Sequence, residues 1–134
     1  MNKKEVERLA ELYFEKTVDL LGESKYHKHT PYLVIERSPE SEGIDNEWHG
    51  EYIPEENEIV IYSDNITSKS DLAKTIVHEY AHYLQDPKWM TRYYTMGYKY
   101  NTHPYEKQAF LIEELNWYKA VSYTHLTLPT KRIV

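Results

Sequence analysis

The stretch Ser68-Lys-Ser-Asp-Leu-Ala-Lys-Thr-Ile-Val-His-Glu-Tyr-Ala-His82 determines how the rest of the chain is interpreted. Its apolar residues recur three and four positions apart, which is the spacing of one face of an α-helix. Ser68 or Ser70 can cap the first turn, and Asp86-Pro87 ends the pattern. The apolar positions are Leu72, Ile76, Val77, Tyr80, Ala81 and Leu84. The stretch therefore predicts an amphipathic helix with one buried face.

Two histidines and a glutamate lie in the second half of this predicted helix. His78 and His82 are four residues apart, so both imidazole rings project from one face and can bind the same metal ion. Glu79 lies beside them, where its carboxylate can take a proton from a metal-bound water. Zinc suits two imidazoles and one further protein ligand, with the fourth position left for water. The alternative is a helix that carries two surface histidines and an exposed glutamate.

A third ligand has to come from the sequence that follows. The available donors are Asp86, His103, Glu106, Glu113 and Glu114. Glu106 is favoured because it opens a second predicted helix at Pro104 and precedes the small residue Ala109, which lets two helices approach closely. A Glu from a second helix completes a known His₂Glu zinc arrangement. The alternative role of Glu106 is to stabilise the first turn of its own helix.

The remaining sequence predicts a small α+β domain. An amphipathic helix is expected from about residue 3 to 21, where Gly22 ends the pattern. Short β-rich runs at 31–36, 48–53 and 58–62 predict strands, the last two joined as a hairpin by a turn at 54–57. A polar loop is expected at 37–47, a short helix at 88–96 and a final helix from Pro104 towards Ala120. This order predicts a small antiparallel or mixed sheet in front of the two helices that carry the candidate ligands.

The composition excludes several classes of protein. The chain has 134 residues, enough for one domain with a single core. A net charge of −6 leaves no basic stripe, so a nucleic-acid partner is not expected. The absence of cysteine excludes disulfides, Cys-ligated zinc and thiol nucleophiles. Neither a secretory signal nor a membrane-length apolar run is visible, which predicts a cytoplasmic protein without a membrane partner.

The last fourteen residues, 121–134, are expected to be a non-native tail. The run Val121-Ser-Tyr-Thr-His-Leu-Thr-Leu-Pro-Thr130 resembles a translated sequencing-library adapter of the transposon-end type. The alternative is a genuine C-terminal strand, because Thr, Leu, Val and Ile suit one. We therefore expect residues 1–120 to form the single domain, and His125 is not counted as a candidate ligand.

The segments His78-Glu-Tyr-Ala-His82 and Pro104-Tyr-Glu-Lys-Gln-Ala109 resemble the minimal gluzincin metallopeptidases. That group includes the ImmA/IrrE-type peptidases of bacteria, phages and mobile elements, and the resemblance covers about residues 72–113. It implies a bacterial or phage source and a zincin-like fold, in which an edge strand binds an extended peptide beside the active helix. The hairpin at 48–62 is the expected source of that edge. The metzincin pattern is excluded, because Gln85 and Lys88 stand where that class has Gly and His.

Carried over by position, the resemblance implies that His78, His82 and Glu106 bind Zn²⁺. It implies that Glu79 is the general base. Larger gluzincins often carry an acid one turn after the ligand Glu, to orient a histidine, where this chain has Phe110.

Further candidates surround this implied site. Glu113, two turns after Glu106, is a candidate to orient a histidine in place of the missing acid; the alternative is a solvated surface glutamate. His103 and Tyr105 flank the ligand helix and are candidates to stabilise the oxyanion of the transition state. The tyrosines of the intervening segment share that candidacy, with surface packing as the alternative. They are Tyr93, Tyr94, Tyr98 and Tyr100.

The leading function is a zinc-dependent metallopeptidase that hydrolyses peptides or proteins. A second hypothesis is a catalytically silent zinc-binding sensor or docking domain, and a third is a structural domain with an accidental motif. Glu79 favours the first, because binding zinc alone requires no acid beside the histidines. The negative net charge favours basic or neutral peptides as substrates.

Overall fold

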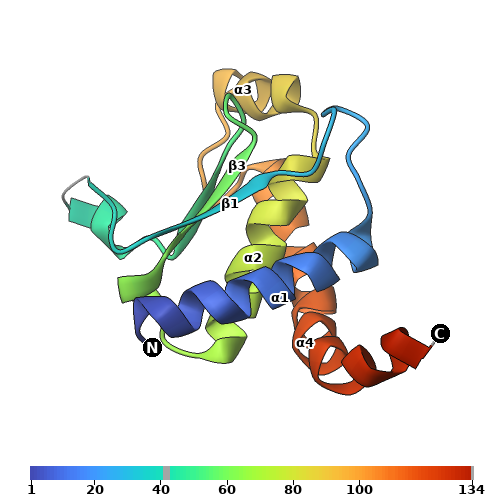
Figure 1. Ribbon diagram of the computed structural model, residues 1–134. Helices are drawn as coiled ribbons and strands as arrows, with labels where there is room; N and C mark the ends of the chain where they lie inside the picture. Colours follow the sequence, from blue (N-terminus) through green and yellow to red (C-terminus); the bar gives the residue numbers. More distant parts are fainter. Residues whose placement is uncertain (41–42, 134) are drawn as a thin grey trace.

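A mixed sheet and the helices beside it form the described part of the chain (Figure 1). The computed structural model describes residues 1–40 and 43–133, without the side chains of 44–45 and 123–133. The chain runs from a helix through a strand and a hairpin to three further helices, so the α+β class expected from the sequence is confirmed. Within these described ranges, no helix is both long enough and apolar enough to cross a membrane.

The sheet has the strand order β1-β3-β2, with β1 at Tyr32–Glu36, β2 at Gly50–Ile53 and β3 at Glu58–Tyr62. β3 pairs in parallel with β1 and antiparallel with β2, so the sheet is mixed. The β2–β3 turn closes through Asn57, whose φ of 50° is one that asparagine tolerates. β2 is thus an edge strand in the described sheet.

Helices α1 (Lys3–Leu21) and α2 (Lys69–Leu84) bury their apolar sides together with the inward-facing residues of the sheet. Residues from all three elements form one apolar cluster, in agreement with the helical periodicity of both segments. Its buried members are Val6, Leu9, Ala10, Tyr13, Ile59, Ile61, Ile66, Leu72, Ala73, Ile76, Tyr80 and Tyr83. This core fixes one side of α2 and leaves its other side to meet the rest of the chain.

Edge strand β2 lies directly against α2. A Cβ atom at Gly50 would lie 2.8 Å from Thr75 Cγ2 and 2.8 Å from the carbonyl oxygen of Val60, so only glycine permits this approach. The first turn of α2 is fixed by Ser68, whose Oγ accepts a hydrogen bond from the Asp71 amide at 3.1 Å. Strand β2 therefore packs closely against a helix whose first turn is fixed.

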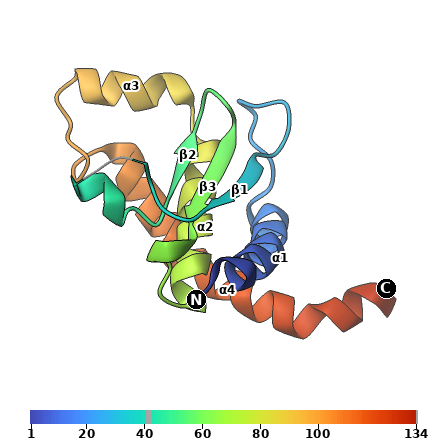
Figure 2. The same cartoon turned by 60° about the vertical axis from the view of Figure 1, so that its left-hand side comes forward.

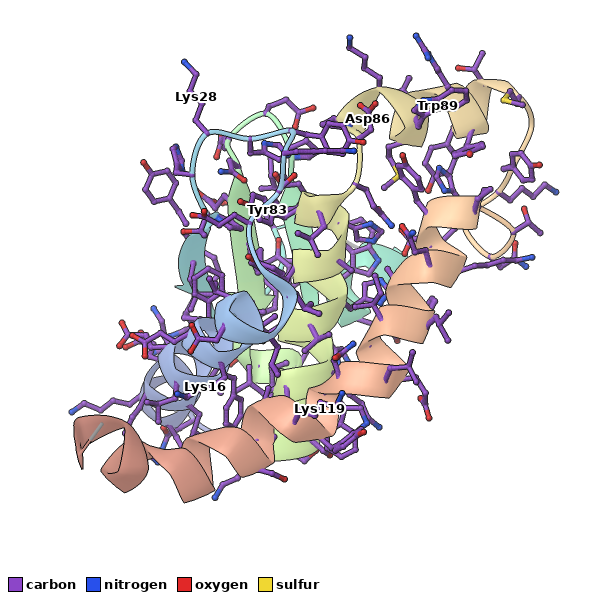
Figure 3. The ribbon with its side chains drawn as sticks, turned by 90° about the vertical axis from the view of Figure 1, so that its right-hand side faces the viewer. Lys16, Lys28, Tyr83, Asp86, Trp89 and Lys119 are labelled. Atoms are coloured by element: carbon purple, nitrogen blue, oxygen red, sulfur yellow. The ribbon has the colours of Figure 1, made fainter. Side chains whose placement is uncertain are left out.

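Helix α3 (Pro87–Thr95) and helix α4 (Pro104–Ile133) follow α2. α3 lies at the opposite end of the molecule from α1 (Figures 1 and 2). Figure 3 shows α4 running beside α2, with Asp86 at the junction of α2 and α3. Asp86 ends one helix and caps the next, because its Oδ1 accepts a hydrogen bond from the Lys88 amide at 3.0 Å.

Two details of the expected secondary structure are corrected. The last helix, expected to run towards Ala120, continues to Ile133. Ala120 is buried in it, and Val121 packs against the apolar cluster. Residues 121–133 are accordingly helical rather than a strand. The segment expected as a plain loop at 37–47 contains a 3₁₀ helix at Gly43–Glu47.

Candidate metal centre

α2 presents two histidines on the side away from the apolar core. His78 and His82 are 7% and 9% exposed, and their ring centroids are 5.1 Å apart. The spacing of four residues places them on successive turns, as the helical periodicity predicts. Neither ring is a surface side chain, so the alternative of two surface histidines is wrong.

α4 brings Glu106 to the same point. Its Oε1 lies 3.0 Å from His78 Nε2 and 3.1 Å from His82 Nε2, and the residue is 8% exposed. One donor atom of each of the three residues lies within 4.8 Å of the other two. Among the described residues, this is the one group of histidine and carboxylate side chains close enough to hold a metal ion.

The outer nitrogens of both rings have hydrogen-bond partners. His78 Nδ1 lies 3.1 Å from Glu113 Oε1, and His82 Nδ1 lies 2.7 Å from Gln85 Oε1. The amide nitrogen of Gln85 donates to the Tyr105 carbonyl at 2.9 Å, so the amide oxygen of Gln85 is the atom that faces His82. A carboxylate and an amide oxygen only accept, so each ring donates from Nδ1.

This arrangement fits a cation. A neutral imidazole with its proton on Nδ1 has a lone pair on Nε2. Two such lone pairs and one carboxylate oxygen then converge in a buried site, where they repel one another unless a positive charge lies between them. Hydrogen bonds to the outer nitrogens of ligating histidines are also typical of metal sites. The buried His78–His82–Glu106 cluster can therefore hold a metal ion.

Without a metal, protons supply the positive charge. Burial favours protonation of Glu106, but hydrogen bonds from His78 and His82 outweigh it and lower the pKa of the carboxyl to about 2. Burial also disfavours the charged form of His78, yet Glu106 and Glu113 raise its pKa to about 10. The pKa of His82 is raised for the same reason, with Glu106 as its main hydrogen-bond partner. The cluster thus attracts positive charge strongly.

The cluster opens into a pocket of about 600 Å³. One side of the pocket is formed by β2 and the residues before it, and others by α2, the start of α4 and the segment that includes α3. Glu79 lines the pocket beside the cluster, and burial raises the pKa of its carboxyl, against the opposing effect of the histidines. Of the tyrosines proposed as candidates, Tyr94, Tyr100 and Tyr105 line the pocket.

The other sequence candidates lie in different surroundings. His103 is fully buried and does not line the pocket; its Nε2 donates to the Met90 carbonyl at 3.0 Å and its Nδ1 accepts from the Tyr105 amide at 3.1 Å. Both of its nitrogens are thus used in holding α3 and α4 together. Glu114 is exposed, and Asp86 is the cap of α3.

Three residues of the site were not singled out by the sequence. Gln85 holds His82, although in the sequence it is only a polar residue three positions after the histidine. His49 lines the pocket, and its Nδ1 lies 2.8 Å from Asp71 Oδ1. Glu51 lines the pocket from β2. The sequence signal for His49 and Glu51 is Gly50, because a glycine inside a predicted strand often marks a close approach of another element.

Comparison of the chain with models of protein families, with curated proteins and with solved structures gave no match. A fold alone does not define an activity.

Proposed function

We propose that the chain is a zinc-dependent metallopeptidase. The observation that carries the proposal is the buried His78–His82–Glu106 cluster, which opens into a pocket lined by Glu79. Two imidazoles and a carboxylate are the protein ligands of one class of catalytic zinc sites, and that class keeps a fourth position for water. The metal choice also agrees with the donors, because imidazole nitrogen suits zinc better than magnesium or calcium.

A zinc ion held by these three residues would supply Lewis acidity, lowering the pKa of a bound water and polarising the carbonyl of the scissile bond. Glu113 and Gln85 keep the rings of His78 and His82 in the orientation that points Nε2 inward. The metal-binding geometry is thus set before any ligand arrives.

Glu79 is the proposed general base. It lies next to His78 in sequence and lines the pocket, and burial raises the pKa of its carboxyl towards the range in which a carboxylate accepts a proton readily. After the tetrahedral stage, the same carboxyl can give the proton to the leaving amine. A zinc-binding module without catalysis would have no use for this acid beside the ligands.

Tyr100 is the proposed donor for the developing oxyanion. Burial and the charges of Glu106 and Glu79 raise the pKa of its phenol to about 12, so the hydroxyl keeps its proton and can donate a hydrogen bond. It lines the same pocket. Tyr94 and Tyr105 line the same pocket and are the alternative donors, whereas His103 has no nitrogen left to donate.

A peptide is the proposed substrate because the pocket runs along an edge strand. β2 pairs on one side with β3, and Gly50, Glu51 and Tyr52 of this strand line the pocket. An extended peptide can add to such an edge through main-chain hydrogen bonds, which hold it without demanding a particular sequence. An edge strand beside the ligand helix is also the arrangement of a zincin-like fold.

Replacement of Glu79 by Gln tests the proposal. The zinc-loaded wild-type chain should cleave an unstructured protein such as casein, and Glu79→Gln should reduce the rate by about 10²–10⁴-fold while one zinc remains bound. Glu114→Gln removes the same charge from an exposed position on α4 and should leave the rate unchanged. Equal rates in wild type and Glu79→Gln would refute the assigned base; bound zinc with no cleavage by the wild type would favour a silent zinc-binding sensor or docking domain.

A further inference from the structure

Glu51 is a pocket residue to which the proposed mechanism gives no task. It is the second residue of β2, between Gly50, which contacts Thr75, and Tyr52, whose ring centroid lies 6.3 Å from that of Tyr83. β2 therefore runs alongside α2 from the level of Thr75 towards that of Tyr83. This path carries the backbone of Glu51 along α2 at the rim of the pocket. Neighbouring side chains of a strand point to opposite faces, so the side chain of Glu51 lies with Tyr62 on the face of the sheet away from α2.

Glu51 shares the pocket with the metal cluster. His78, His82 and Glu106 line the same pocket, and so does Glu79. Glu51 thus lies on the edge strand proposed to hold the substrate, in the lining that also contains the proposed general base.

One oxygen of Glu51 is fixed and the other is available. Oε2 accepts a hydrogen bond of 2.5 Å from the hydroxyl of Tyr62, a largely buried residue on the neighbouring strand β3. Oε1 has no hydrogen-bond or ion-pair partner in the described part of the chain. A carboxylate whose orientation is set by a neighbour and which keeps one oxygen free is suited to bind a cation.

The rest of the pocket does not neutralise this charge. Six carboxylates line it, belonging to Glu51, Asp71, Glu79, Asp86, Glu106 and Glu113. The one ammonium group in the lining is that of Lys74, and it lies 4.9 Å from the ring centroid of Trp117. A divalent cation at the cluster would still leave the pocket negatively charged, so a positively charged group gains free energy on entering it.

We propose that Glu51 binds the ammonium or guanidinium group of a lysine or arginine side chain next to the scissile bond, so that the preferred substrates are basic peptide segments. This inference rests on the proposed peptidase function. Neighbouring side chains of an extended peptide point to opposite faces, so a residue close to the cleaved bond can reach the edge strand while the carbonyl faces the metal. Glu51 is in this sense a specificity-determining residue rather than a catalytic one.

The test uses zinc-loaded chain and blocked peptides that differ only in carrying Lys, Arg, Gln or norleucine beside the cleaved bond. Charged hydrogen bonds of this kind should favour the Lys and Arg peptides about 10- to 100-fold in kcat/KM over the neutral ones. In Glu51→Gln this ratio should fall towards one, whereas Glu55→Gln, at an exposed position in the turn outside the pocket, should retain it. The wild-type preference should also shrink as salt is raised.

Binding separates this inference from the peptidase proposal. Fluorescence anisotropy of a labelled Lys peptide on zinc-loaded Glu79→Gln, with and without Glu51→Gln, measures recognition without hydrolysis. Loss of binding on removing Glu51 would support the inference even if the wild type cleaved no peptide, an outcome that would refute only the peptidase. An unchanged Lys/norleucine ratio in Glu51→Gln, or no binding of the Lys peptide, would each overturn the inference.

Discussion

The α2–α4 interface and helix α3 line the same pocket, but they are built in different ways. At the interface, the histidines, Glu106 and Ala109 are buried, and hydrogen bonds link one helix to the other. α3 has no buried residue among its nine. Trp89, which Figure 3 labels on α3, contacts Tyr93 and Arg92 of the same helix, and the contacts of α3 with α4 run through half-exposed rings such as that of Tyr93, which meets Tyr105.

The difference matches two demands on such a pocket. A metal cluster works only if its donors are held in a narrow range of positions, and buried, hydrogen-bonded side chains provide that. A wall that meets varied side chains of a substrate does not need the same precision. Regions with little buried apolar contact open at lower free-energy cost, so we expect α3 to be the less stable part of the pocket.

The largest expected effect is the loss of zinc affinity when a ligand of the metal cluster is changed. Glu106→Gln keeps the shape of the side chain but removes the negative charge that the two histidines face. Zinc affinity should fall by more than the roughly 10- to 100-fold that follows loss of an outer hydrogen-bond partner. Metal content after dialysis against a competing chelator measures the change, with about one zinc per wild-type chain expected.

Two variants make this result specific. Glu114→Gln, on the same helix but exposed, should keep its zinc, and Glu113→Gln, which weakens the hydrogen bond from His78, should fall between the two. Zinc retained at wild-type affinity in Glu106→Gln would mean that the third ligand is another residue. No zinc in the wild type would favour a structural role for the cluster.

The second effect concerns protons in the metal-free chain. The pKa of His78 is raised from 6.5 to about 10, so its contribution to stability is complete below pH 6.5 and is lost as the pH rises towards 10. The pKa of Glu106 is lowered from 4.5 to about 2, so its contribution is lost as the pH falls through that range. Urea unfolding of the chelated protein should therefore show maximal stability between about pH 4.5 and 6.5, falling at higher pH by about 1.4 kcal/mol per pH unit for each proton bound only by the folded chain.

Zinc should reverse this dependence, because it replaces the protons of the cluster. The stabilisation by zinc is expected to increase from pH 6 to pH 8, and binding at pH 7 should release protons to the buffer. Calorimetry in buffers of different ionisation enthalpy measures that release. A chelated protein whose stability is flat from pH 6 to 9 would show that the histidines are not held by the two glutamates.

The fold was largely predictable because its signals are local. Helix spacing, the cap at Ser68 and the hairpin turn at 54–57 depend on residues a few positions apart, and the structure follows them. The parallel pairing of β1 with β3 was less accessible, since it depends on how the chain returns through residues 37–49. The end of α4 was not predicted, because residues 121–134 were set aside as a non-native tail and left out of the fold prediction.

The site also combines residues with a local sequence signal and residues that only long-range contacts bring in. His78 and His82 are recognisable because one helix fixes their spacing, and Glu106 was selected only by its setting in a second helix. Gln85 and Glu51 carry no sequence signal of their own. Their importance arises from contacts across the fold, with His82 in one case and with the pocket in the other.

The smallest expected effects are changes in unfolding free energy that compare the α2–α4 interface with helix α3. Ala109 is fully buried on the face of α4 that carries Glu106 and Glu113. A larger side chain there should push the helices apart, so Ala109→Leu should lower the free energy of unfolding by about 1–3 kcal/mol. Trp89→Ala removes a larger side chain from the surface of α3 and should cost less than about 1 kcal/mol. Urea unfolding of zinc-loaded variants measures both. A cost for Trp89→Ala that equals or exceeds that of Ala109→Leu would show that α3 is packed as firmly as the interface, and the contrast between precise and adaptable walls would be wrong.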